Sequence, residues 1–222
     1  MLTDTMLLNL STLRAAIVDL DGTMVDTLGD FDLALNRTLK ALGLQGVSRA
    51  FIERTVGKGG EHLVRQTLAH VGADAALFVA AWTAYQQHYA EVNGQHSQVF
   101  EGVVEGLEKL RARGWRLAGL TNKPRAPALA LLQAKGLAGY FELCFGGDSF
   151  ERKKPDPLPL LRTCAALGVA PAQALMVGDS RNDAEAARAA GCPVVLVSYG
   201  YNHGEPVQAV GADAVVDRLD HL

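Results

Sequence analysis

The sequence lacks the features that mark several classes of protein. Its 222 residues include three cysteines (Cys144, Cys164 and Cys192), an odd number with wide spacing and no C-x-x-C pair. A disulfide framework or a zinc knuckle is therefore not expected, and the thiols should be inert. The six histidines show no metal-ligand spacing such as H-E-x-x-H. The longest apolar run, Ala75–Trp82, is far short of the roughly 20 residues that span a membrane, so no membrane partner is expected.

A strong excess of charge of one sign is also absent. Lys and Arg number 21 and Asp and Glu 24, which gives a formal net charge of −3. Nucleic acid is not an expected partner, because proteins that bind it usually carry a basic surface. Residues 1–11 have neither the positive start nor the small-residue cleavage pattern of a signal peptide. We therefore predict a cytoplasmic protein, either a monomer or a homodimer.

Short apolar runs rich in branched residues alternate with helix-like stretches, a pattern typical of βαβ units and a parallel sheet covered on both faces. The run at Ala214–Val216 is a candidate edge strand. The predicted fold class is α/β, with a Rossmann-like parallel sheet as its core. The main predicted strands are Ala15–Leu20, Leu117–Thr121, Leu143–Phe145, Leu175–Val177 and Val194–Val197.

Almost 100 residues separate the first two runs, and this gap has the periodicity of helices. One helical face, which ends at Gly43, carries Phe31, Leu35, Leu39 and Leu42. Ser48 is the predicted N-cap of a second helix. We therefore predict a discontinuous core of residues 1–27 and 98–222, with an inserted α-helical domain at residues 28–97.

Two carboxylates, Asp19 and Asp21, end the first run and are followed by Gly22. In open α/β sheets, ligands bind at the carboxyl ends of the strands. If the chain stays extended here, the two side chains share one face, because strand side chains alternate. Such a pair suits a hard cation such as Mg²⁺, with one carboxylate as nucleophile and the other as general acid and base. The simpler alternative is an Asp-Gly turn that ends a strand.

Polar side chains also follow the next predicted strands. Thr121 and Asn122 come after the second run, where a hydroxyl and backbone amides suit a phosphate oxygen. Lys154 follows the third run, and nearby prolines restrict its backbone. Asp179 ends the fourth run, and Asp183 lies one helical turn later. Each feature alone fits a strand exit, a solvated turn or a helix cap. Four such motifs in order, each at the end of a predicted strand, together indicate one functional site.

In these motifs the sequence resembles the haloacid dehalogenase-like phosphatases, and the match covers nearly the whole chain. The resemblance implies that Asp19 is the nucleophile and forms an aspartyl-phosphate. It implies that Asp21 protonates the leaving oxygen and later activates water. Thr121, Asn122 and Lys154 would hold the phosphate oxygens.

The same resemblance implies a Mg²⁺ site and a substrate-selecting cap. Asp19, the backbone carbonyl of Asp21 and Asp179 would hold the ion. Asp183 would be either a further ligand or the partner of Lys154. The helical insert corresponds to the cap of this family, which closes over the site.

Within the family the chain is most similar to the phosphoglycolate phosphatases, so the implied substrate is a small phosphorylated metabolite. Arg54 or Lys58, in the predicted cap, is a candidate contact for a glycolate carboxylate, although both also fit solvated surface charges. Related phosphatases or mutases that act on sugar phosphates or nucleotides remain an alternative. A receiver domain is disfavoured, because there the phosphorylated Asp lies on a later strand than the acidic pair. The resemblance to the phosphoglycolate phosphatases rests on residues 120–124, 154–157, 178–183, 198–202 and 204–206.

Overall fold

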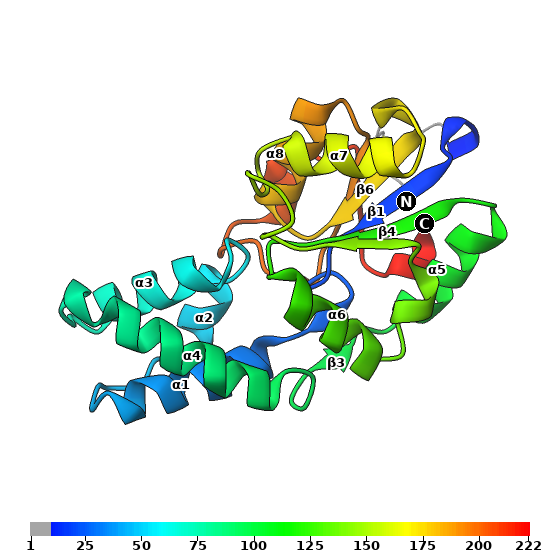
Figure 1. Cartoon of the computed structure of the whole chain (residues 1–222). Helices are drawn as coiled ribbons and strands as arrows, with labels where there is room; N and C mark the ends of the chain where they lie inside the picture. The colour runs from blue at the N-terminus through cyan, green and yellow to red at the C-terminus, as the bar shows by residue number, and fades with distance from the viewer. Residues whose placement is uncertain (1–9) are drawn as a thin grey trace.

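The centre of the molecule is a parallel β-sheet, seen in the computed structural model, which describes residues 10–222 (Figure 1). Within these residues the sheet has six strands in the order β5-β4-β1-β6-β7-β8. This is the order of a doubly wound Rossmann-like sheet, in which the winding direction changes beside the first strand. The strands are β1 Ala15–Val18, β4 Arg116–Leu120, β5 Leu143–Phe145, β6 Ala174–Gly178, β7 Val194–Val197 and β8 Ala214–Val216.

Some of the sequence predictions fall on the first nine residues, which lie outside the described range. These are most of the segment in which no signal peptide is predicted and the beginning of the predicted core segment 1–27. In residues 10–222, no helix is both long and apolar enough to cross a lipid bilayer.

The central strands are apolar throughout because helices cover both faces of the sheet. All four residues of β1 are fully buried, and alternate residues belong to different clusters. Ala16 and Val18 pack with helices α5 and α6, whereas Ala15 and Ile17 pack with α7 and α8. Figure 1 shows these two pairs of helices on opposite sides of the sheet. Their bounds are α5 Val103–Ala112, α6 Arg125–Ala134, α7 Leu158–Ala166 and α8 Arg181–Ala190.

The long predicted insert is helical, and it projects from the carboxyl edge of the sheet (Figure 1). As predicted, Ser48 caps a helix, and its side chain accepts a hydrogen bond from the Phe51 N–H at 3.3 Å. The helices share a third hydrophobic cluster, which also includes Tyr201 from the core. These helices are α1 Leu28–Ala41, α2 Arg49–Thr55, α3 Gly60–His70 and α4 Phe78–Val92. The short 3-10 helices are η1 Leu10–Thr12, η2 Ala75–Leu77, η3 Ala138–Tyr140, η4 Pro171–Gln173, η5 Val207–Val210 and η6 Leu219–His221.

Two very short strands, β2 Val25–Asp26 and β3 Gln98–Val99, were not predicted. They form an antiparallel pair in which Val25 lies opposite Val99 and Asp26 opposite Gln98. Two residues per strand are too few to give a periodic signal. The pair brings together the points where the chain leaves the core and returns to it.

The first strand ends at Val18, earlier than the predicted end at Leu20. After Val18 the chain turns sharply, and the N–H groups of Met24 and Val25 both donate to the Leu20 carbonyl, at 3.0 and 3.1 Å. Gly22 has a φ of +81°, which glycine adopts readily. The turn therefore replaces the last part of the predicted strand, and its residues line the site described next.

Candidate active site

Asp19 and Asp21 lie on the turn that follows the central strand β1. The Asp19 N–H still donates to the Val177 carbonyl at 2.9 Å, so this residue continues the strand direction. Both aspartates line one cavity of about 410 Å³. A Cβ atom at Gly22 would lie 2.2 Å from Asp179 Oδ2, so only glycine leaves room for that carboxylate. The two aspartates therefore share one cavity although the chain turns here and does not stay extended.

Asp179 and Asp183 lie where β6 passes into helix α8. Asp179 Oδ1 accepts from the Thr23 hydroxyl at 3.1 Å, and its Oδ2 accepts from the Tyr201 N–H at 2.6 Å. Asp183 Oδ2 accepts from the Ser180 N–H at 3.1 Å and from the Ser180 hydroxyl at 2.8 Å. Asp183 therefore caps its own helix and is completely buried. These hydrogen bonds hold both carboxylates in fixed orientations.

Lys154 places a buried ammonium between two of these carboxylates. Its Nζ lies 2.7 Å from Asp183 Oδ1 and 3.1 Å from Asp19 Oδ1, and it donates to the Leu120 carbonyl at 2.8 Å. Burial lowers the pKa of Lys154, but the neighbouring Asp183 and Asp19 outweigh burial and raise it overall. Lys154 therefore stays charged. Asp183 thus contacts Lys154 through Oδ1 and Ser180 through Oδ2.

Thr121 and Asn122 follow β4 and lie at the same edge of the sheet. Both line the cavity, and the Thr121 hydroxyl oxygen accepts from the Lys123 N–H at 3.2 Å. The Asn122 side-chain amide donates to the Gly57 carbonyl and to the Lys154 carbonyl, each at 2.9 Å. Asn122 thus connects the helical insert, through Gly57, to the backbone of the buried lysine.

The carboxylates of this site repel one another in a buried setting. Burial, together with Asp183 and Asp21, raises the pKa of Asp19 to about 7, although Lys154 lowers it. Burial and the charges of Asp183 and Asp19 also raise the pKa of Asp179 well above its usual value. One cation, Lys154, therefore does not balance the negative charge of the cluster.

The cluster fits a divalent cation. Asp19, Asp179 and Asp183 each offer a carboxylate oxygen, and these oxygens lie within 4.8 Å of one another. Asp19 Oδ1 is buried and, apart from its ion pair with Lys154, accepts no well-aligned hydrogen bond. A donor set made only of oxygens suits a hard cation. A bound ion would supply the positive charge that the cluster lacks.

This electrostatic arrangement predicts that the metal-free protein loses stability as the pH rises. The folded-state pKa of Asp19, about 7, lies above its unfolded value of about 3.9. Between these values the folded state binds the additional proton, so the free energy of unfolding falls as the pH rises through this window. We expect urea denaturation in EDTA to give a lower midpoint at about pH 8 than at about pH 5.5, and Mg²⁺ to raise the midpoint more at the higher pH.

The matched control for this measurement is Asp19→Asn, which removes one carboxylate of the cluster. Its midpoint should fall less between the two pH values than that of the wild type. A wild-type midpoint at about pH 8 that does not respond to Mg²⁺ would contradict the assignment of a metal site.

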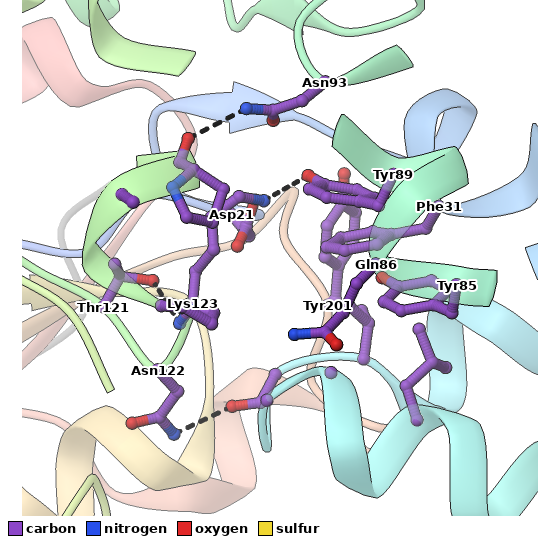
Figure 2. A pocket seen from close by; sticks show the side chains of 18 of the residues that line it. Asp21, Phe31, Tyr85, Gln86, Tyr89, Asn93, Thr121, Asn122, Lys123 and Tyr201 are labelled. Atoms are coloured by element: carbon purple, nitrogen blue, oxygen red, sulfur yellow. Dashed lines mark hydrogen bonds and ion pairs between the residues drawn. The ribbon is translucent and has the colours of Figure 1, made fainter. Parts of the chain in front are cut away.

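Helices of the insert form the opposite wall of the cavity. Figure 2 shows Phe31 from α1 and Tyr85 and Tyr89 from α4 facing Asp21, Thr121 and Lys123 across the cavity. Burial and the charge of Asp21 raise the pKa of Tyr89, so its hydroxyl stays protonated. The aromatic side chains of the insert and the aspartates after β1 and β6 therefore line the same cavity.

The chain as a whole can now be compared with known proteins. Residues 16–197 match the haloacid dehalogenase-like hydrolase family. The chain belongs to the haloacid dehalogenase-like hydrolases. The sequence resemblance stated above is thereby confirmed at the level of the family.

Two curated relatives of this hydrolase are phosphoglycolate phosphatases. The one from Thiobacillus denitrificans is 45% identical over 210 residues, which covers 93% of this chain and 92% of the relative. The plasmid-encoded one from Cupriavidus necator is 46% identical over 211 residues, covering 94% and 90%. The crystal structure of a predicted phosphoglycolate phosphatase from Haemophilus somnus is 33% identical, with a TM-score of 0.89, and the match covers 94% of this chain and 96% of that one.

Some residues of this hydrolase site were not predicted from the sequence. Lys123 and Tyr89 line the cavity and contact each other, and Tyr201 lies beside them. Lys123 directly follows Thr121 and Asn122, so its position after the second predicted strand could have marked it as a residue of the site. Tyr89 gave no signal, because an aromatic residue on a helical stripe is typical of a hydrophobic core.

The two predicted substrate contacts of the insert lie elsewhere. Neither Arg54 nor Lys58 is among the described residues that line the cavity. The Arg54 Nε donates to the Ala50 carbonyl at 3.1 Å on the exposed side of α2. Lys58 lies in the glycine loop before α3, where its charge contributes to lowering the pKa of His62.

Proposed function

We propose that this hydrolase is a Mg²⁺-dependent phosphatase that converts 2-phosphoglycolate into glycolate and phosphate. The names of the relatives described above support this substrate. The observation that carries the proposal is the different surroundings of two neighbouring carboxylates. Asp19 lies in the acidic cluster beside Lys154, whereas Asp21 pairs with Lys123 on the side of the insert. Two such carboxylates on one turn suit a nucleophile and a separate acid and base.

In the first step, an Asp19 carboxylate oxygen attacks the phosphorus atom. The new O–P bond forms an aspartyl-phosphate, and the ester bond between phosphorus and the leaving oxygen breaks. Asp21, in its protonated form, gives its proton to that oxygen, so glycolate leaves without a high-energy alkoxide. Asp21 lines the cavity, so its carboxyl group can reach the leaving oxygen of a substrate bound there.

In the second step, water attacks the phosphorus atom of the aspartyl-phosphate. Asp21, now ionised, accepts a proton from this water, and the bond between phosphorus and Asp19 breaks. Phosphate leaves, and both aspartates return to their starting forms. The covalent intermediate divides one difficult hydrolysis into two easier displacements.

The remaining residues hold the phosphoryl group. Lys154 offsets the negative charge of the phosphoryl oxygens. The Thr121 hydroxyl and Asn122, which follow β4, contact the same oxygens. Asp19, Asp179 and the backbone carbonyl of Asp21 would hold Mg²⁺, which would neutralise phosphate charge in both steps. In this assignment Asp183 orients Lys154.

We further propose that residues 28–97 act as the cap, with residues 1–27 and 98–222 as the core. The hydrogen bond from Asn122 to the Gly57 carbonyl, at 2.9 Å, supports a closed position of the insert. Arg54 and Lys58, the predicted cap contacts for the substrate carboxylate, are not among the described residues that line the cavity. A cytoplasmic location and a monomeric or homodimeric state also remain predictions.

A substrate panel tests the proposed function. We expect kcat/KM with Mg²⁺ to be highest for 2-phosphoglycolate, by about tenfold or more over sugar phosphates, nucleotides and pyrophosphate, because a charged contact to the glycolate carboxylate is worth a factor of this order. A flat profile would contradict the glycolate assignment but not the phosphatase mechanism. A maximum for a hexose phosphate or a nucleotide would favour the alternative substrate classes.

A further inference from the structure

One positive charge faces the cavity from the leaving-group side. Among the described residues that line the cavity, Lys123 alone carries a cationic side chain. Its side chain is 3% exposed, so its ammonium is nearly removed from bulk water. A buried ammonium beside a binding space interacts strongly with any anion placed there, because little water screens it.

The contacts of Lys123 leave one of its donors available. Its Nζ lies 2.9 Å from Asp21 Oδ1, and it donates a hydrogen bond to the Tyr89 hydroxyl oxygen. The same nitrogen lies 4.8 Å from the centre of the Phe31 ring and 4.6 Å from that of Tyr89. An ammonium has three N–H donors, and in the described part of the chain two acceptors engage it. The third N–H has no acceptor among the described residues, and Lys123 lines the cavity.

We propose that Lys123 selects the substrate by pairing with the carboxylate of the glycolate leaving group. This inference rests on the proposed function, in which Asp21 contacts the leaving oxygen. In 2-phosphoglycolate a single CH₂ group joins that oxygen to the carboxylate. A carboxylate so close to the leaving oxygen must lie near Asp21, and the ammonium 2.9 Å from Asp21 is within its reach.

The surroundings of Lys123 also explain how selection would work. The Phe31 and Tyr89 rings lie beside the ammonium and shield it from water. Charge-assisted hydrogen bonds are roughly twice as strong as neutral ones. A substrate that carries a carboxylate at this position therefore gains an interaction that a neutral analogue lacks.

The cations of the insert are less well placed for this role. Arg54 is hydrogen bonded to its own helix, and Lys58 lies near the basic Lys153 and His62 at the outer end of the loop. Neither lines the cavity in the described residues. Lys123, by contrast, belongs to the core and directly follows two predicted phosphate contacts.

The test compares 2-phosphoglycolate with 2-hydroxyethyl phosphate, in which a neutral CH₂OH group replaces the carboxylate. The measured quantity is the ratio of kcat/KM for the two substrates. Lys123→Met keeps the aliphatic stem against Phe31 and Tyr89 but removes the charge. We expect the ratio to fall by about 10- to 100-fold in Lys123→Met, the range for loss of a hydrogen bond to a charged group.

Two outcomes would overturn the inference. If Lys123 acts only by orienting Asp21, both substrates will lose activity equally and the ratio will not change. If Lys58→Met lowers the ratio and Lys123→Met does not, the carboxylate contact belongs to the insert. Lys109→Met, the same change on the outer surface of α5, is the control and should leave the ratio as in the wild type.

The same experiment separates this inference from the proposed function. A wild-type enzyme with no preference for 2-phosphoglycolate would overturn the function itself. A wild-type preference that survives in Lys123→Met would overturn only the role of Lys123. If Lys123→Met has too little turnover to measure, calorimetric affinities for both compounds in Asp19→Asn and in Asp19→Asn/Lys123→Met give the same ratio without catalysis.

Discussion

Asp19→Asn should lower kcat by about 10⁴-fold or more, since loss of a catalytic nucleophile removes the covalent route and costs losses of this order. The amide nitrogen and oxygen of asparagine fill the same space, but the side chain cannot form the aspartyl-phosphate. Asp19 is the carboxylate that lies in the acidic cluster 3.1 Å from Lys154 Nζ. Steady-state hydrolysis of 2-phosphoglycolate with Mg²⁺ measures the effect.

The same variant should not be less stable than the wild type when metal is removed. Burial raises the pKa of Asp19 to about 7, so its ionised form disfavours the folded state above that pH. We expect the Tm of Asp19→Asn in EDTA at about pH 8 to equal or exceed that of the wild type. Turnover within tenfold of the wild type would overturn the role of Asp19, and a large fall in Tm would show that the loss reflects misfolding.

Lys154→Met should destabilise the protein by about 3–5 kcal/mol, the usual cost of removing one partner of a buried ion pair. The Lys154 side chain is 2% exposed, and its ammonium contacts both Asp183 and Asp19. Without it, the carboxylates of the cluster repel one another with no cation beside them. Urea denaturation in EDTA at about pH 8 measures the loss, and activity should fall with it because a phosphate contact is removed.

The adjacent Lys153 provides a matched control, because it is exposed whereas Lys154 is buried. Lys153→Met should change stability by less than about 0.5 kcal/mol, as is usual for surface substitutions. In Lys154→Met the loss should be smaller at about pH 5.5 than at pH 8, since protonation of the unpaired carboxylates relieves their repulsion. Equal losses at both pH values would show that packing, and not charge, explains the effect.

The sheet was predictable because its strands are short apolar runs, and the central ones are buried on both faces. Val194–Val197 and Leu143–Phe145 have the predicted bounds, and Ala214–Val216 is an edge strand as expected. The end of β1 was not predictable from its apolar run, since Leu20 is buried like a strand residue but accepts the hydrogen bonds of a turn. Hydrophobicity reports burial, and it does not report which backbone groups pair.

The acidic part of the site was visible in the sequence, because parallel strands bring their carboxyl ends to one edge. Asp19 and Asp179 follow the neighbouring strands β1 and β6, so the pairing of those strands brings them together. The side of the cavity that helix α4 forms could not be predicted from the sequence. Tyr89 reaches Lys123 only because the tertiary fold brings α4 opposite the segment after β4, a relation that helical periodicity does not encode.

The pairing of β2 with β3 also affects how the insert can be attached to the core. Asp26 and Gln98 lie directly opposite each other, so the long helical segment departs from and rejoins the chain at neighbouring points. A short hairpin turn would close this gap with no change to the sheet or to the residues after β1, β4 and β6. Insertion of a segment whose two ends lie close together is well tolerated. The helical insert and the sheet that carries the acidic cluster can therefore change in length and sequence separately from each other.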